Sequence, residues 1–333
     1  MVSELLPIRG LHLESNTTRR DLLKRAGLLG AASLLPSISL GGRHHHHHDR
    51  LSRRNVLRIA HFTDPHISPE GPSAKWLAKA LEHANSLPQR PNMILFGGDM
   101  VLDGTSVSKS RMAAQWKTFH DTVRDHNSLP VNYCIGNHDV WGWFSRDADS
   151  LDRQYGKQWV QDGLSLNKPY YSMDRNGWHI VVLDSIHRHK GGYVGKLDEE
   201  QIAWLDADLA AHASMPTLVT SHIPLMSACA GLVTPRSETD GSHWHVSGAH
   251  MHIDGRRIKD VFVRHSNVNL CISGHVHLLE GLQYNGIGYA SSGSVSGNWW
   301  KGNFQETPPG YALVDLFEDG SWHHDYVTYG WSA

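Results

Sequence analysis

The chain reads Val-Asn-Tyr-Cys-Ile-Gly-Asn-His-Asp over residues 131–139, an apolar run followed at once by polar side chains. The run 131–135 has the length and β-branched content of a buried strand. Asn137, His138 and Asp139 follow it directly, and Gly136 allows a close approach of the backbone to a ligand. This stretch predicts a strand that ends on a functional loop.

Four more apolar runs end in the same way. The runs 56–62, 93–96, 217–220 and 268–272 are followed by Thr63-Asp64-Pro65-His66, Gly97-Gly98-Asp99, Ser221-His222 and Ser273-Gly274-His275-Val276-His277. One such segment alone is more often an ordinary turn or a buried core histidine. In an open α/β sheet, however, functional groups gather outside the carboxyl ends of the strands. Five such segments in order therefore predict one shared site at one edge.

The segments between these runs predict the fold class. Helical periodicity covers residues 74–87, 110–124, 198–211 and 256–265, and a further apolar run covers 179–183. Strands that alternate with helices predict an α/β fold with a largely parallel sheet covered on both faces. Asp198 is expected to cap the third helix, with Gln201 completing a capping box. The segments 281–292 and 311–328 have strand character without an intervening helix, so we expect them to form a second layer.

Composition excludes several classes of protein. The chain has 333 residues, of which 40% are hydrophobic, and this is enough apolar material to exclude a disordered chain. A net charge of -2 argues against binding nucleic acid by charge. Three cysteines are too few for a disulfide scaffold. The 26 histidines stand out, because histidine is the commonest metal ligand and proton-transfer group.

The amino-terminal residues resemble a twin-arginine export signal. Arg19 and Arg20 precede an apolar segment, 26–40, that is short for a membrane span and contains Pro36. We expect residues 1–42 to be this signal, 43–54 a linker with histidines at 44–48, and 55–333 the functional domain, located in the periplasm or outside the cell. An amphipathic helix packed on the domain is the alternative. A retained membrane anchor also stays open, because no Ala-x-Ala cleavage site follows.

The order of the five motifs resembles that of the calcineurin-like metallophosphoesterases, from about residue 56 to residue 328. The resemblance implies a β-sandwich of two sheets flanked by helices, with two bound metal ions. It implies a first metal site of Asp64, His66 and His277, a second of Asn137, His222 and His275, Asp99 as the bridge, and His138 as a substrate-facing acid. Within the family, the chain is similar to bacterial members grouped with cyclic-nucleotide phosphodiesterases and related exported phosphoesterases.

The implied ligand set has a chemical logic of its own. Carboxylate and imidazole together suit Mn, Fe or Zn. Two cations that share one water lower its pKa enough to give a bridging hydroxide near neutral pH, and they take up charge on the phosphoryl oxygens. His138 would give the departing alkoxide its proton. We therefore expect two-metal hydrolysis of a small-molecule phosphate ester, either a phosphodiester or a phosphomonoester, with no stable nucleic-acid binding and membrane contact only through the export signal.

Two positions depart from better-known branches of the family. Purple acid phosphatases carry a metal-binding tyrosine where this chain has Leu102, so no tyrosinate–iron chromophore is expected. Protein Ser/Thr phosphatases carry Asp at that position and Glu in place of Asp139. Whether Asp103 or Asp139 orients His138 is therefore left open by the sequence.

The sequence also contains candidates for other functions and for further site residues. A non-catalytic metal- or carbohydrate-binding protein on the same fold is the alternative function, although such a protein should have lost a ligand or His138. A serine hydrolase is disfavoured because no Gly-x-Ser-x-Gly pentapeptide occurs. Trp141 and Trp143 could stack on a substrate or pack in the core, and residues 187–189 could line the phosphate pocket or form a loop. His243, His245, His250 and His252 could hold a third metal or lie in a loop. Trp299, Trp300 and Lys301 are candidates for the rim of a cleft.

Overall fold

The protein is described here by a computed structural model over residues 39–41, 53–233, 242–243 and 245–333. The predicted export signal (1–42) and linker (43–54) lie outside the described residues, apart from 39–41 and 53–54. Residues 39–41 form the short strand β1 (Ser39–Gly41), which pairs with a strand near the carboxyl terminus. Within the described part of the chain, no helix is both long and apolar enough to cross a membrane.

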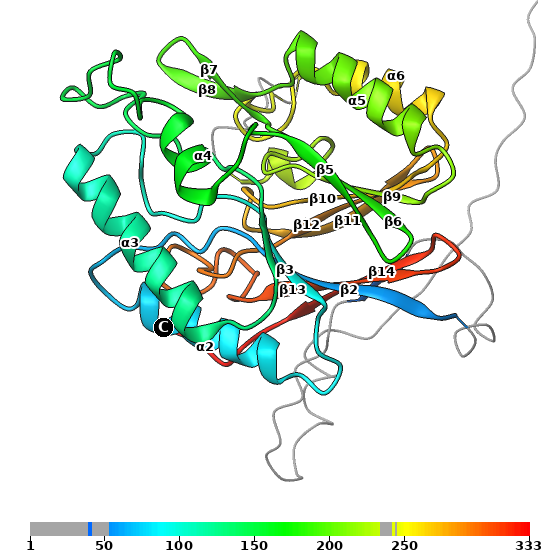
Figure 1. Ribbon diagram of the computed structural model, residues 1–333, viewed down its shortest axis with the longest axis horizontal. Helices are drawn as coiled ribbons and strands as arrows, with labels where there is room; N and C mark the ends of the chain where they lie inside the picture. Colours follow the sequence, from blue (N-terminus) through cyan, green and yellow to red (C-terminus); the bar gives the residue numbers. More distant parts are fainter. Residues whose placement is uncertain (1–38, 42–52, 234–241, 244) are drawn as a thin grey trace, which may run out of the picture. The chain divides into compact units, whose positions relative to one another are not determined.

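Two six-stranded sheets form the centre of the domain (Figure 1). The first sheet contains, in spatial order, β1, β14 (Trp322–Val327), β13 (Tyr311–Phe317), β2 (Asn55–Phe62), β3 (Met93–Phe96) and β4 (Val131–Tyr133). The second contains β11 (Leu279–Tyr284), β12 (Ile287–Ser292), β10 (Val268–Ser273), β9 (Thr217–Thr220), β6 (Trp178–Val182) and β5 (Tyr171–Arg175). A separate hairpin is made by β7 (Ile186–His189) and β8 (Gly192–Gly195).

The two sheets pack on each other through one face of each strand. Successive side chains of a strand point to opposite faces of its sheet. Ile59 of β2 and Leu95 of β3 accordingly enter an apolar cluster shared with Leu218 and Leu270 of the second sheet. Their neighbours Ala60 and Phe96 point the other way, into a cluster under the helices. The sandwich therefore has both sheets covered on both faces.

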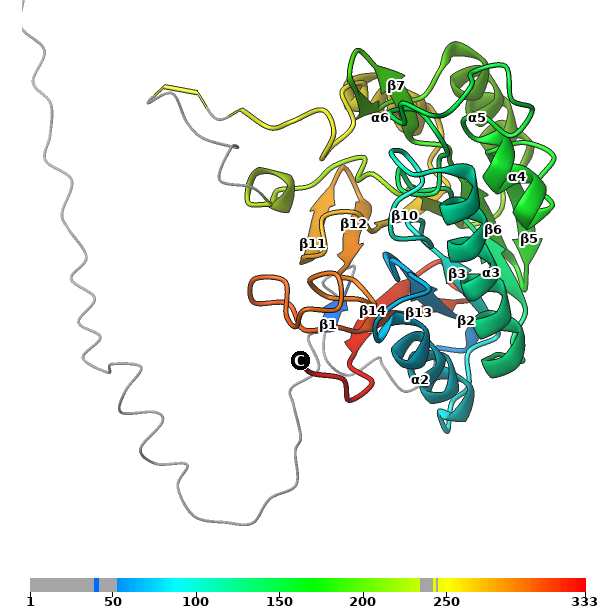
Figure 2. The same ribbon diagram turned by 90° about the vertical axis from the view of Figure 1, so that its left-hand side faces the viewer.

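Helices cover the outer faces of the sheets (Figure 2). On the first sheet lie α2 (Ser73–Ser86) and α3 (Lys109–His126), which bury Leu77 and Phe119 against it. On the second lie α5 (Glu199–Ala211) and α6 (Gly255–Arg264), which pack against β9 and β10. The short helix α4 (Gln158–Leu164) and a 3₁₀ turn, η1 (Cys229–Gly231), lie in connections.

The observed architecture confirms the two-sheet arrangement that the resemblance implied, and it divides the strands of the largely parallel sheet expected from periodicity between both sheets. Pairing is parallel among β2, β3 and β4 and among β6, β9, β10 and β12, but β13 runs antiparallel to β2. The carboxyl-terminal strands do not form one added layer: β11 and β12 extend the second sheet, whereas β13 and β14 extend the first. The residue types of a strand indicate that the strand is buried, but they do not indicate which sheet it joins.

The amino-terminal end of α5 differs in one detail from the expected capping box. The Asp198 side chain accepts a hydrogen bond from the backbone N–H of Gln201 at 2.8 Å, as predicted. The Gln201 side chain does not return to Asp198; it binds the backbone N–H and carbonyl of Asp184 instead. Gln201 is buried, so its amide satisfies the backbone just after β6.

Candidate metal centre

The loops that follow β2, β3, β4, β9 and β10 bring together every residue that the sequence analysis assigned to the site. Three overlapping groups have potential ligand atoms within 4.8 Å of one another: Asp64 with His66 and His277, Asp99 with His222 and His275, and His66 with Asp99 and His138. Asn137 joins the second group, with its Oδ1 3.2 Å from His222 Nε2. The five segments thus meet at the carboxyl ends of the parallel strands.

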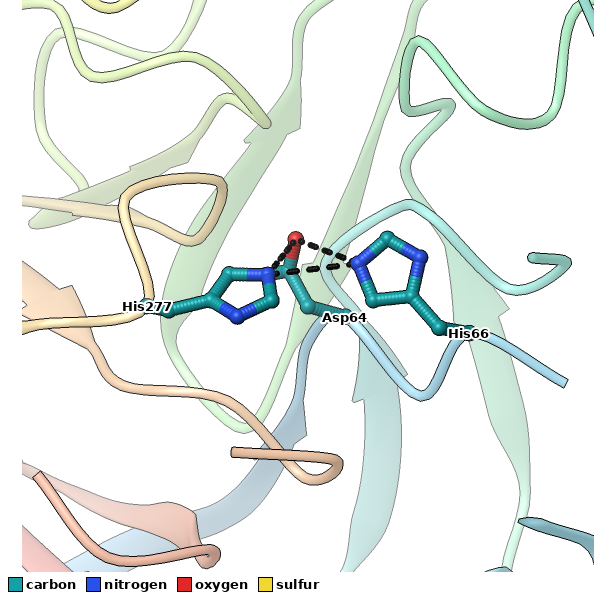
Figure 3. A group of neighbouring side chains, drawn as sticks. All are labelled: Asp64, His66 and His277. Atoms are coloured by element: carbon teal, nitrogen blue, oxygen red, sulfur yellow. Dashed lines mark hydrogen bonds and ion pairs between the residues drawn. The ribbon is translucent and has the colours of Figure 1, made fainter. Parts of the chain in front are cut away.

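The first group consists of Asp64, His66 and His277 (Figure 3). Asp64 Oδ1 lies 3.3 Å from His277 Nε2 and 3.8 Å from His66 Nε2, and the two nitrogens are 3.2 Å apart. His277 Nδ1 donates to the carbonyl of Gly297 at 2.6 Å, which directs the Nε2 lone pair of the neutral ring into the group. Asp64 Oδ1 is buried without a hydrogen-bond donor. Electron-pair donors from all three side chains thus face one another, and this arrangement is suited to binding a cation.

The second group is oriented by backbone carbonyls in the same manner. His222 Nδ1 donates to Gly97 O at 2.8 Å, so its Nε2 lone pair faces Asp99 Oδ2 at 3.3 Å. His275 Nε2 donates to Ala249 O at 2.8 Å, which leaves its Nδ1 as the nitrogen available to a metal. Such outer hydrogen bonds fix the tautomer of a metal-binding histidine. The chemistry of this donor set also fits a cation.

Asp99 lies between the two groups. Its Oδ2 is 3.3 Å from His222 Nε2, 3.9 Å from His66 Nε2 and 3.9 Å from His138 Nε2. The side chain is 2% exposed, so these contacts are screened very little by solvent. Asp99 is the carboxylate that faces both histidine groups.

The buried charges of the site attract positive charge. Burial alone would raise the pKa values of Asp64 and Asp99, but the neighbouring histidines outweigh this effect and hold both pKa values below the usual value of an aspartate. Burial also opposes protonation of His222, yet Asp99 and Asp64 raise its pKa to about 9. Metal binding and protonation compete for the same lone pair. A site that raises the pKa of a buried histidine therefore also favours a metal cation.

Five of the assigned residues have left-handed backbone conformations, which non-glycine residues rarely adopt. The φ angles are 57° for Asp64, 44° for His66, 53° for Asp99, 67° for His275 and 56° for His277. The loops hold one another in place: Asp64 N–H donates to Gly98 O and His66 N–H to Asp99 O, both at 3.0 Å. Such strain is concentrated at functional sites, where the surrounding structure enforces it.

Two glycines of the motifs are required by close contacts. A Cβ on Gly274 would overlap the side chains of Thr63 and Asp64, and a Cβ on Gly136 would overlap Asp99. These two positions therefore admit only glycine while the carboxylates keep their places.

His138 is oriented by a backbone carbonyl and by neither of the two carboxylates that the sequence left as alternatives. Its Nδ1 donates to Leu102 O, its backbone N–H donates to Asp99 Oδ1 at 2.7 Å, and its ring is 29% exposed. Asp103 instead accepts from Thr105.

Asp139 has a different role: its carboxylate accepts backbone N–H groups from both neighbouring loops. The donors are Asp99, Met100, Val101 and Gly136, at 2.8–3.3 Å. Burial and the charge of Asp99 raise the pKa of Asp139 to about 7 in spite of these donors.

A cavity of about 230 Å³ opens onto the site. It is lined by His66, Asp99, His138, Tyr193, Val233, His250, His275, His277, Trp299 and Phe304. Trp299 and His250 were among the open candidates, whereas Tyr193 and Phe304 were missed because a lone aromatic residue carries no local pattern. His250 therefore faces the cavity, but it belongs to none of the ligand groups found among the described residues.

Most of the other candidates lie away from this cavity. Trp141 is buried and its indole donates to Val107 O, which makes it a core residue. Arg188 lies on β7 and binds Tyr155 Oη and Trp143 O, so the expected loop is a strand of the β7–β8 hairpin. His252 is buried between Ser221 and Asp254 and joins none of the ligand groups found among the described residues.

A further group that the sequence analysis missed contains Asp174, His179 and His212. It is explained by ion pairing. His179 lies at the amino-terminal end of β6, and its two ring nitrogens contact Asp174 and Asp208 at 2.7 and 2.8 Å. Although burial opposes it, the two carboxylates raise the pKa of His179. The His212 ring stacks on it at 3.8 Å. An imidazolium shared by two carboxylates accounts for this arrangement.

Comparison with known proteins places the chain in a family. The sequence matches the calcineurin-like phosphoesterase family over residues 57–279. It is similar to a probable cyclic nucleotide phosphodiesterase of Synechococcus sp., with 26% identity over 272 residues that cover 80% of this chain and 90% of that protein. A probable glycerophosphodiester phosphodiesterase of Arcobacter nitrofigilis is 24% identical over 246 residues, which cover 72% of this chain and 78% of that protein.

The fold has a counterpart among solved structures. A dimetal phosphatase from Danio rerio superposes with a TM-score of 0.57 at 14% identity, covering 79% of this chain and 96% of that one. The matched family segment exceeds half of the chain and contains all of the assigned site residues. The chain therefore belongs to the calcineurin-like phosphoesterase family and is a metal-dependent phosphoesterase.

Proposed function

We propose that this protein hydrolyses phosphodiesters at a centre of two metal ions. The observation that carries the proposal is the position of Asp99 between two oriented groups of imidazoles. One metal would be held by Asp64, His66 and His277, the other by Asn137, His222 and His275, and both by Asp99. The mixed carboxylate and imidazole set suits Mn, Fe or Zn.

The protein's own residues prepare this site for an in-line displacement. When bound, the two cations supply an activated water and stabilise charge on the phosphoryl oxygens. Leu102 O holds the proton of His138 on Nδ1 in the neutral ring, and Nε2 faces the cavity next to Asp99. A second proton on Nε2 can then pass to the departing oxygen, because a histidine positioned next to the leaving group is an efficient general acid.

The charge of the cavity favours a diester over a monoester. A phosphomonoester is largely a dianion at neutral pH, and enzymes commonly bind phosphate groups with arginine or lysine. None of the described residues that line the cavity is an arginine or a lysine. A diester carries one negative charge, and its two substituents can use the aromatic walls. The names of the two relatives, a cyclic nucleotide phosphodiesterase and a glycerophosphodiester phosphodiesterase, support the same substrate class.

The role of His138 can be tested with leaving groups of different acidity. An alkoxide needs a proton to depart, whereas nitrophenolate leaves readily as the anion. A general acid contributes about 10²–10⁴-fold in rate. His138→Ala should therefore lose about that factor on alkyl diesters and much less on bis(4-nitrophenyl) phosphate, with the metal content unchanged.

One control variant and one contrary outcome make the test decisive. His126→Ala removes an exposed histidine that pairs with Glu82 far from the site and should behave as the wild type. An equal loss of activity across the leaving-group series would show that His138 binds the phosphoryl group and does not donate the proton.

A further inference from the structure

We propose that Trp299 is the specificity-determining residue of this site and stacks against a planar substituent, such as a nucleobase or an aryl group, on the phosphodiester. The inference rests on the proposed phosphodiesterase function and adds a substrate class to it. It starts from the walls of the cavity, which are aromatic beside both histidine groups.

Trp299 lies directly beside the first histidine group. Its ring centroid is 4.6 Å from that of His277 and 5.5 Å from that of His66. Phe304 meets it edge to face at 5.8 Å and 83°. Trp299 is partly exposed and lines the same cavity as His138. A phosphate held at the metal centre would therefore carry a substituent within reach of the indole face.

The backbone keeps the Trp299 ring in this position. Trp299 and Trp300 have φ angles of 47° and 63°, so two successive bulky residues are left-handed. Trp300 anchors the pair, because its indole N–H donates to Pro65 O at 2.9 Å and its backbone N–H donates to Ser296 O at 2.9 Å. Non-glycine residues persist in such conformations where the surrounding structure enforces them, and these positions cluster at ligand-binding sites.

The opposite side of the cavity offers a different surface. Tyr193 lies beside the second group, with its ring 6.1 Å from His275, and Val233 and His250 complete this side. The two substituents of a diester would thus meet different walls. Among the described residues that line the cavity, only those on the Trp299 side include an indole supported by a second aromatic ring. Stacking on an aromatic side chain tolerates any base, because every base has a π-face.

A purely structural role for Trp299 predicts a different result. If the indole only shields His66 and His277 from solvent, its removal should weaken metal binding and lower the turnover of every substrate by the same factor. If the indole binds a planar group, its removal should lower kcat/KM for planar substrates alone. The ratio of the two losses separates these roles.

The experiment compares two substrate classes on metal-loaded enzyme. Adenosine 3′,5′-cyclic monophosphate and bis(4-nitrophenyl) phosphate carry planar groups, whereas glycerophosphoethanolamine and glycerophosphoglycerol do not. Trp299→Leu should lower kcat/KM for the planar pair by about 10–100-fold, the usual effect of one lost base stack. The aliphatic pair should change by less than about threefold, with the metal content unchanged. Adenosine 5′-monophosphate should lose potency as a competitive inhibitor by the same factor as the planar pair.

Three further variants make the result unambiguous. Trp299→Phe should keep most of the selectivity, and Phe304→Leu should reduce it in the same direction, so a failure of Trp299→Leu to fold leaves the test intact. Trp143→Leu is the matched control, because Trp143 lies outside the cavity.

Equal losses on both substrate classes would overturn the proposal, and so would a wild-type enzyme that hydrolyses only the aliphatic diesters. A wild-type enzyme without metal-dependent turnover of any diester would instead overturn the proposed function.

Discussion

Asp139→Asn should destabilise the protein, although Asp139 joins none of the ligand groups found among the described residues and does not orient His138. Its carboxylate accepts four backbone N–H groups, from Asp99, Met100, Val101 and Gly136, at 2.8–3.3 Å. These bonds join the loop after β3 to the loop after β4. An asparagine keeps one acceptor oxygen and turns an NH₂ group toward the other donors, so two buried N–H groups lose their partner.

The magnitude follows from two opposing effects. A hydrogen bond to a charged group contributes about 1.5–3 kcal/mol, so the two lost bonds cost roughly 3–6 kcal/mol. Asparagine also removes the negative charge that burial and Asp99 disfavour, which returns part of this cost, so we expect a net loss of roughly 2–3 kcal/mol. For a domain of this size, 1 kcal/mol shifts Tm by about 2–4 °C, which gives a decrease of about 4–12 °C. Turnover should fall as well, because either pair of donors that could be released includes backbone of the loop that carries Asp99.

The assay is urea and thermal unfolding of chelator-treated protein at pH 8, above the pKa of about 7, where Asp139 is ionised. Asp103→Asn is the matched control. Asp103 is half-buried, and among the described residues its side chain accepts from Thr105 and Ser106 alone, whose N–H and O–H donors can bind water instead. Its cost should stay below about 1 kcal/mol. Equal stabilities for the two variants, or an Asp139→Asn protein as stable as the wild type, would refute this reasoning.

Two other predictions concern acid stability and export. His61 and His324 contact Ser292 Oγ in the core at 2.8 and 3.0 Å, and burial lowers their pKa to about 3 and 4. The unfolded chain therefore binds more protons below pH 6.5, and the free energy of unfolding should fall as the pH drops from about 6.5 to 4. In urea titrations, His324→Gln should reduce that slope by about 1.4 kcal/mol per pH unit. An unchanged slope would contradict this role of His324. Replacing Arg19 and Arg20 with lysine should keep the protein in the cytoplasm on cell fractionation, whereas continued export would show that the twin-arginine route is not used.

The sequence predicted which side chains meet at the candidate site, because potential metal ligands follow the strands. Asp64, Asp99 and His222 each stand within three residues of the end of an apolar run, so their residue types and order were sufficient to place them together. The partners that orient the histidines could not be predicted, because the carbonyls of Gly97 and Ala249 are backbone groups without a residue preference. For the same reason Leu102 O was missed as the partner of His138.

The fold was less predictable than the site. Apolar runs such as residues 93–96 and 217–220 indicated buried strands, and the structure confirms them. Their distribution between two sheets depends on contacts between distant segments. The edge strand β5 and the hairpin β7–β8 were missed because their mixed polar residues lack a clean alternation of buried and exposed positions. Trp299 could not be assigned a role, since its ring position depends on a left-handed backbone that the sequence does not reveal.

The metal content of Asp99→Ala tests the central claim most directly. It should be measured by elemental analysis beside His66→Ala and His222→Ala, in a chain whose histidines at 44–48 are replaced, because a run of histidines binds metal by itself. We predict two metals per chain in the parent, the loss of about one in each histidine variant, and a loss greater than either in Asp99→Ala, with no turnover. Two metals per chain in Asp99→Ala would contradict the account.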